Sequence, residues 1–369
     1  MKTSEILLKQ GARSTHGGFT LVEIMVGLAI GMLAAIVIMQ VLANFEAQKR
    51  STTGAADAQT NGSIALFKLQ REMQMGGYPL LPVTDPALNC SNLTLNGVAV
   101  NRYDITSSVL INDETGANGE GDTIVINYGN GALGGIPADI NFIAGNVVTV
   151  QSNFGCNVND TALIILPNAT HQNLTCAMTT VTAVSPGGVA PETITLTNNN
   201  VANAVAAPPP NISCVGQWQT VTYNVVGGVL MRNGVPSMDG VVSLQAQYGI
   251  ALAANKNTAN ENAIVGWVNA TGAWANPTVA NRNLIKAVRV AIVARNEKLE
   301  AANVSNACSS TVIAAPAPTG VCAWTPIAGS PAPALNLAAG DANWQRYSYR
   351  VFDTIVPLRN VMWGRGVLQ

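Results

Sequence analysis

Glu23 is the residue that most clearly needs an interaction partner, because its carboxylate lies inside a long apolar run. The stretch of about 26 residues after Phe19 is nearly all apolar and, at about 1.5 Å per residue in a helix, is long enough to cross a hydrocarbon core of about 30 Å. A carboxylate at membrane depth costs roughly 2.5 to 3.5 kcal/mol, and such a group normally has a partner. Cleavage between Gly18 and Phe19 would create a terminal amine just before Glu23, and we expect this amine, in the same or a neighbouring chain, to be the partner.

The residues before the apolar run favour such a cleavage. Basic residues outnumber acids there, which keeps this end of the chain in the cytoplasm: Lys2, Lys9 and Arg13 stand against Glu5. An ordinary secretory signal is cut after its apolar region, whereas here the small residues Gly17 and Gly18 precede it. The sequence therefore predicts a leader over residues 1–18 that is removed and a membrane-spanning helix that is retained.

A second group of oxygen ligands lies in the segment 112–122, NDETGANGEGD. Asp113, Asn118, Glu120 and Asp122 lie among glycines there, and calcium prefers carboxylate and carbonyl oxygens on a flexible loop. The spacing does not match the EF-hand, and the closing glutamate is absent. Two interpretations stay open, a calcium loop and a solvated hairpin loop.

All six cysteines lie beyond the apolar run: Cys90, Cys156, Cys176, Cys214, Cys308 and Cys322. An even count in an exported chain indicates disulfides. We expect Cys308 to pair with Cys322 across a short Ala/Pro-rich loop and, as a second choice, Cys156 to pair with Cys176. No C-x-x-C pair exists, and His171 is the only histidine beyond the leader, which argues against a zinc or redox site.

The composition also argues against nucleic-acid binding and against the common enzyme classes. Removing residues 1–18 takes away three basic residues and one acid, which leaves 16 against 19 and a net charge of −3. No basic patch is therefore expected to bind nucleic acid. The chain has no G-x-S-x-G elbow and no glycine-rich phosphate loop, and His171 lies in a polar stretch. We expect no catalytic residues and no cofactor.

The elements that position these residues are a long helix and many short strands. Residues 19–78 read as one helix, weakened in its middle by Gly54 and Gly62, whose second half has apolar residues at mostly three-to-four spacing: Ile64, Leu66, Phe67, Leu69, Met73 and Met75. Strands rich in β-branched residues follow at 122–129, 146–151, 161–166 and 192–197, and later at 241–248, 286–298 and 347–356. On these last strands we expect arginines on the solvent side, namely Arg289, Arg346, Arg350 and Arg359, with Tyr349 and Trp363 in the core. The predicted fold is α+β, a helix packed on antiparallel sheets.

The predicted organisation has four parts: the leader (1–18), the helix (19–78), a variable β-rich region (79–220) and a more regular β region (221–369).

The sequence G-F-T-L-V-E at residues 18–23, with its basic leader and apolar helix, resembles the start of type IV pilins and of the pseudopilins of type II secretion. The resemblance implies that a prepilin peptidase cleaves after Gly18, that the new amine of Phe19 is methylated, and that Glu23 guides subunit assembly. It also implies an inner-membrane protein, with a cytoplasmic N-terminus and its bulk in the periplasm, that enters a pilus.

Four later segments, 230–234, 239–249, 285–295 and 349–363, resemble the C-terminal half of the PilW minor pilins, which are related to the J-type pseudopilins. This resemblance implies a protein for type IV pilus assembly that joins other minor pilins in a priming complex at the pilus tip, with the major pilin and a tip adhesin as further partners. The closing PLRN-x-x-W segment favours the pilus over secretion.

Two alternatives stay open. The first is a minor pseudopilin of type II secretion. The second, from another class, is a periplasmic enzyme or binding protein with an uncleaved membrane anchor.

Overall fold

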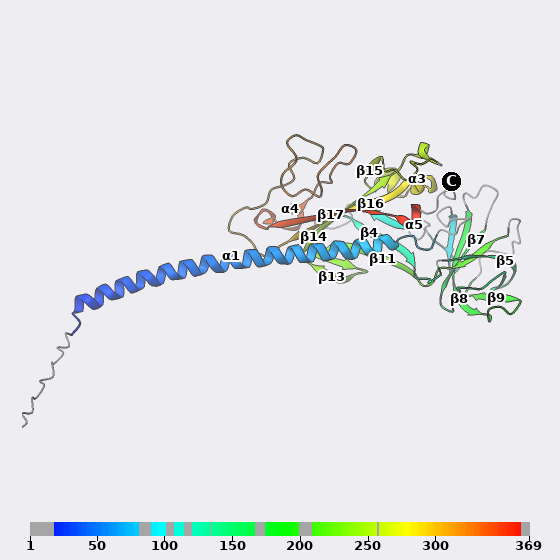
Figure 1. The fold of residues 1–369 in the computed structure, drawn as a ribbon, viewed down its shortest axis with the longest axis horizontal. Coiled ribbons are helices and arrows are strands. Elements are labelled where there is room, and N and C mark those ends of the chain that lie inside the picture. Colours follow the sequence, from blue (N-terminus) through cyan, green and yellow to red (C-terminus); the bar gives the residue numbers. More distant parts are fainter. Residues whose placement is uncertain are drawn as a thin grey trace, which may run out of the picture. The chain divides into compact units, whose positions relative to one another are not determined.

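The computed structural model describes residues 18–80, 90–100, 107–113, 120–133, 135–166, 174–198, 209–256 and 258–362 (Figure 1). The chain divides into two compact units, residues 1–53 and residues 54–369. The leader up to residue 17, Asn118, His171 and Trp363 lie outside the described residues, so the predictions made for them stay predictions.

Helix α1 (Leu21–Met75) begins in the first unit. Between Leu21 and Glu46 it is apolar enough to cross a membrane, with a mean hydropathy of 2.6, and its side chains there are exposed. Since no proline interrupts this part, every backbone group after the first turn is bonded within the helix, as a lipid environment demands.

Within the second unit, the last turns of α1 bury a narrow stripe of small and apolar residues against β-strands: Ala58, Gly62, Ala65, Leu69 and Met73. Leu69 and Met73 belong to the predicted apolar face. Ile64 and Phe67 do not, because they lie on the opposite side of the helix, where Phe67 is 65 % exposed. The predicted face was therefore partly wrong: the small residues at 58, 62 and 65 allow the helix backbone to approach the strands closely.

Two antiparallel sheets form the main core with this part of α1. The first has the order β13-β12-β11-β4-β3, with strands β13 (Val235–Asp239), β12 (Val229–Arg232), β11 (Trp218–Val226), β4 (Thr123–Gly129) and β3 (Val109–Asn112). The second has the order β15-β14-β16-β17, with strands β15 (Gly266–Val268), β14 (Val241–Ile250), β16 (Ile285–Arg295) and β17 (Tyr349–Pro357). Their inward side chains share one hydrophobic cluster with Ala65, Leu69 and Met73.

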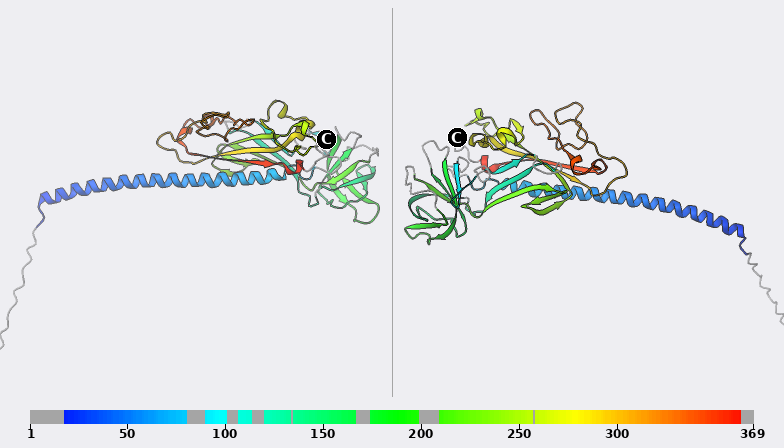
Figure 2. Two further views of the ribbon diagram at one scale, coloured as in Figure 1. Left: turned by 45° about the horizontal axis from the view of Figure 1, so that its top comes forward. Right: turned by 180° about the vertical axis from the view of Figure 1, so that it is seen from behind.

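A third sheet of eight strands curls into a small barrel. Its strands are β2 (Val98–Val100), β1 (Cys90–Leu95), β8 (Leu174–Val184), β7 (Thr161–Leu166), β10 (Asn211–Cys214), β5 (Pro137–Ala144), β6 (Val147–Val150) and β9 (Glu192–Leu196), in that order. Because β9 also pairs with β8, the six strands from β8 to β9 close on themselves around a core of their own. All pairs in this ring are antiparallel, whereas β1 joins β8 in parallel. The barrel strands, coloured green, form a group of their own in both views of Figure 2.

The barrel is an insertion in a hairpin. Strands β4 and β11 pair from Ile124 with Tyr223 to Gly129 with Trp218, so the connection between them, residues 130–217, holds the whole six-stranded ring. Strands β1 and β2 come instead from the connection between α1 and β3.

Short helices complete the fold: η3 (Ala253–Asn255), η4 (Gly272–Trp274), α3 (Val279–Leu284), α4 (Leu337–Gly340), η5 (Trp344–Arg346) and α5 (Arg359–Met362). The predicted α+β class, with a long N-terminal helix and antiparallel sheets, is confirmed. The predicted strands are also present. The four-part division of the chain stays a prediction; β3 and β4, from its variable region, pair into the same sheet as β11 and β12.

The structure pairs the six cysteines into three disulfides. Cys308 is joined to Cys322, the pair that the sequence favours. The second expectation was wrong: Cys156 is joined to Cys214, and Cys176 to Cys90. The cause is the strand order, which sets β10 beside β7 and β1 beside β8 and so brings cysteines together across 58 and 86 residues of sequence.

Candidate assembly interface

The N-terminal motif forms the first turn of α1. The Glu23 amide donates to the backbone oxygen of Thr20 at 3.0 Å and to its hydroxyl at 3.3 Å, so Thr20 caps the helix. The Glu23 carboxylate lies in this turn, where the helix dipole favours negative charge. Its side chain is exposed, and no residue among those described pairs with it. The motif therefore leaves an acidic group in an apolar surface without a partner in its own described chain.

Gly18 and Phe19 lie ahead of that turn. Phe19 is 79 % exposed, and a Cβ built on Gly18 would meet no atom within 4 Å. No contact within this chain therefore requires a glycine at position 18. A requirement for glycine there must come from another molecule.

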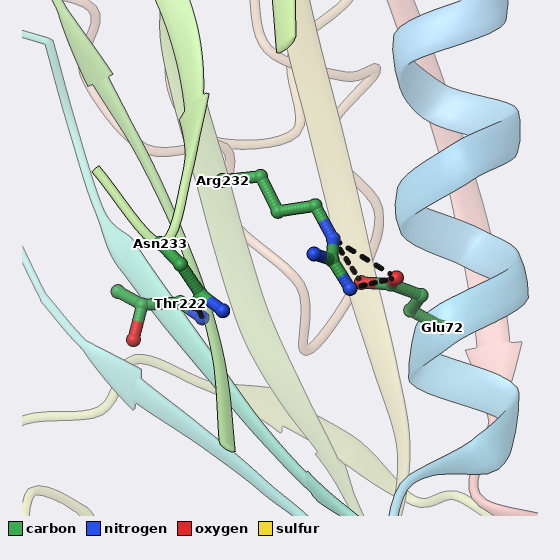
Figure 3. Close-up of polar contacts among 4 residues, drawn as sticks. All are labelled: Glu72, Thr222, Arg232 and Asn233. Atoms are coloured by element: carbon green, nitrogen blue, oxygen red, sulfur yellow. Dashed lines mark hydrogen bonds and ion pairs between the residues drawn. The ribbon is translucent and has the colours of Figure 1, made fainter. Parts of the chain in front are cut away.

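An ion pair anchors the last turns of α1 to strand β12 (Figure 3). Two nitrogens of the Arg232 guanidinium, Nη2 and Nε, donate to Glu72 Oε1 at 2.8 and 3.1 Å. The bond to Glu72 raises the pKa of Arg232, and burial followed by the Glu72 carboxylate raises the pKa of Tyr223 beside it. Both residues therefore keep their ordinary protonation at neutral pH.

The turn after Arg232 has a defined hairpin geometry. Asn233 and Gly234 both have positive φ, 51° and 74°, which is the type I′ geometry of a two-residue hairpin between β12 and β13. Asn233 Oδ1 accepts from the Thr222 amide at 2.7 Å and ties the turn to β11 (Figure 3).

A second anchor comes from the C-terminal PLRN sequence. The Asn360 side-chain amide lies 3.3, 3.3 and 3.1 Å from the carbonyl oxygens of Gln74, Met75 and Gly76. Carbonyls at a helix C-terminus have no partner within the helix, and Asn360 supplies one from the other end of the sequence.

Arg289 was predicted on the solvent side of its strand and is instead buried. Its guanidinium lies over the Trp324 ring at 4.7 Å, with Asp353 Oδ2 at 3.1 Å and Ser330 Oγ at 3.3 Å. The segment that follows Cys322, with Ala323, Trp324 and Ala332, covers this face of β16, which a strand pattern alone does not show. Arg350 and Arg359 are exposed, as expected.

The acidic segment joins the two main sheets. Asp122 Oδ2 accepts from the Ala246 amide at 2.6 Å, and Glu120 Oε1 accepts from the Gly227 amide at 2.5 Å. Between them Gly121, at a φ of +92°, forms a bridge with Leu244, whose carbonyl a Cβ would strike. Both carboxylates thus bond to backbone donors, and among the described residues no group of three or more metal-ligating side chains is found.

Comparison with known proteins decides the family. Residues 13–39 match the prokaryotic N-terminal methylation motif, and residues 210–360 match PilW, the type IV pilus-assembly protein W. Residues 210–360 of the chain form a PilW-family region. No curated protein and no solved structure matches it.

The PilW match contains β10 to β17 and therefore both anchors of α1, Arg232 and Asn360. The barrel strands β5 to β9 lie outside both matches. The chain is a type IV pilus-assembly minor pilin whose N-terminal motif implies a prepilin peptidase and other pilus components as partners.

The sequence predicted Glu23 and its motif but missed Gly62, Glu72, Arg232 and Asn360. The PLRN sequence was noted as a family feature, whereas its contact with the end of α1 appears only in the fold.

Proposed function

We propose that this minor pilin primes pilus assembly as part of a complex with other minor pilins at the pilus tip. The observation that carries the proposal is the pairing of a prepilin-type N-terminus with a PilW-type C-terminal half in one chain. Prepilin peptidase removes residues 1–18, and the mature chain begins at a methylated Phe19. Glu23 then neutralises the terminal amine of a neighbouring subunit in the membrane.

Three features support this proposal. Glu23 lies in an exposed apolar helix surface, where a carboxylate needs a positive partner. The steric freedom at Gly18 fits a glycine required by a peptidase and not by the fold. The C-terminal match is to a pilus-assembly family, which favours the pilus over a type II secretion pseudopilin.

Glu23→Ala tests the role of the carboxylate. We expect normal leader cleavage but roughly tenfold fewer pili per cell. A free-energy change of about 1.4 kcal/mol shifts an equilibrium tenfold. The ion pair that Glu23→Ala removes offsets a larger free-energy cost, that of placing a carboxylate at membrane depth. Electron microscopy counts the pili, and co-purification from membranes with the other minor pilins reports on the complex. Glu46→Ala, at the far end of the apolar run, is the matched control and should leave both unchanged. Unchanged pilus numbers in Glu23→Ala would count against the assigned role.

A further inference from the structure

Strand β17 forms a long free edge of its sheet. It ends the order β15-β14-β16-β17 and pairs with β16 over nine residues without a register shift. The other edge strands of the two main sheets are short or interrupted: β15 has three residues, β3 has four, and β13 contains Pro236.

The hydrogen-bond pattern shows which backbone groups of β17 point outward. The Leu358 amide donates to the Lys286 carbonyl, and the Asn296 amide donates to the Ser348 carbonyl. The residue pairs just inside these bonds, 287 with 357 and 295 with 349, are therefore non-hydrogen-bonded pairs of the antiparallel ladder. The alternation between these ends leaves the backbone groups of Tyr349, Val351, Asp353 and Ile355 facing away from β16. No described residue bonds to them.

Proteins normally protect such an edge with charge, proline, a bulge or a covering segment, because it pairs readily with another strand. Over its nine residues β17 has only Arg350 and Asp353 as charges, and its one proline is the last residue. Ile355, on the open edge, is 49 % exposed.

An open cavity of about 400 Å³ lies beside this edge. Most of its exposed lining is polar and includes both charged residues of β17, Arg350 and Asp353, while Trp324, Tyr349 and Val351 also line it. An added strand directs alternate side chains to one face, and this cavity would receive them.

We propose that the outer edge of β17 binds an extended strand of a different pilus subunit, which continues the sheet and places a polar side chain in the cavity beside Arg350 and Asp353. The proposal rests on the function proposed above, since the partner is a pilus component. A second copy of this chain is not the occupant, because two β17 edges paired antiparallel would close as a two-fold dimer, whereas an open filament needs head-to-tail contacts.

The first test places a photo-crosslinking amino acid at position 355 of the full chain in piliated cells. The expected result is a covalent adduct with another pilus subunit that mass spectrometry maps to one contiguous, strand-forming segment. Val235, which is more exposed than Ile355 and lies on the edge strand that contains Pro236, is the control position and should give no such adduct. An adduct only with a second copy, or none at all, overturns the proposal.

The second test is Ile355→Pro against Ile355→Thr. Proline removes an outward N–H and blocks the added strand but leaves the bonds to β16 in place, since an edge strand tolerates proline when its N–H faces solvent. We expect Ile355→Pro to lower co-purification with the crosslinked subunit about tenfold, the effect of losing one or two hydrogen bonds, while Ile355→Thr retains it. An unchanged thermal unfolding temperature in both variants shows that the sheet has folded.

These outcomes separate the two proposals. Normal assembly in Ile355→Pro together with loss of pili in Glu23→Ala overturns the strand docking alone. Normal pili in both variants overturn the docking and the proposed function together.

Discussion

Gly62 shows how a single residue sets the distance between α1 and the sheet. A Cβ at this position would lie 2.2 Å from Phe352 Cε2 and 3.1 Å from the Ala294 methyl. A glycine inside a helix costs roughly 0.5 to 1 kcal/mol relative to alanine. The close packing that it allows must offset this cost.

We therefore expect Gly62→Ala to lower the stability of the second unit by about 1 to 3 kcal/mol, the usual effect of overpacking a core. Thermal unfolding of the full chain in detergent measures the change. Gly54→Ala is the matched control, because a Cβ there meets only the Asn296 side chain, at 3.3 Å. Its gain in helix propensity should leave stability unchanged or raised. An unchanged or higher unfolding temperature in Gly62→Ala would contradict this packing account.

At the residue scale, the sequence predicts that a side chain needs an interaction partner but does not identify the partner residue. Glu23 stands out because a carboxylate in an apolar run has a known cost. Arg289 was misplaced because the loop that covers it is distant in sequence, and Gly62 looked like a weak point because its contact, Phe352, lies on the last strand.

At the scale of elements, two disulfides cross-link the sheet that forms the barrel. Cys156 to Cys214 joins the connection before β7 to the end of β10, and Cys90 to Cys176 ties β1 to β8. The sequence predicted the strands from their β-branched residues. It could not predict their pairing, because β7 is apolar on both faces and gives no alternation that would set its neighbours.

Replacing Cys156 and Cys214 together by serine should destabilise the barrel by about 2 to 4 kcal/mol, because the disulfide restricts the unfolded chain. Hydrogen exchange with mass spectrometry should show faster exchange in β5 to β10 and little change in β11 to β17. The double variant Cys308→Ser with Cys322→Ser serves as the control, with its effect confined to the loop from Cys308 to Cys322 and the residues next to it. Faster exchange throughout the molecule in the first variant would show that the barrel does not unfold independently of the other sheets.

At the scale of the whole molecule, the groups assigned to assembly lie outside the inserted barrel. Between Arg102 and Arg232 the chain has no lysine or arginine, so the barrel's carboxylates, Asp139, Asp160 and Glu192, have no lysine or arginine partner within it. The residues that anchor α1, Glu72, Arg232 and Asn360, belong to the helix and to the PilW-matched half. The molecule thus combines a PilW-matched scaffold with an inserted barrel of which only β10 lies within a family match.

The central claim is that a processed N-terminus turns this chain into a subunit that assembles through its apolar helix. Mass spectrometry of the mature protein from wild-type cells tests it most directly. The account predicts an N-terminal peptide that begins at Phe19 and carries one methyl group, and the full leader in cells without the prepilin peptidase. A mature chain from wild-type cells that still begins at Met1 would contradict the account and favour a membrane-anchored protein of another class.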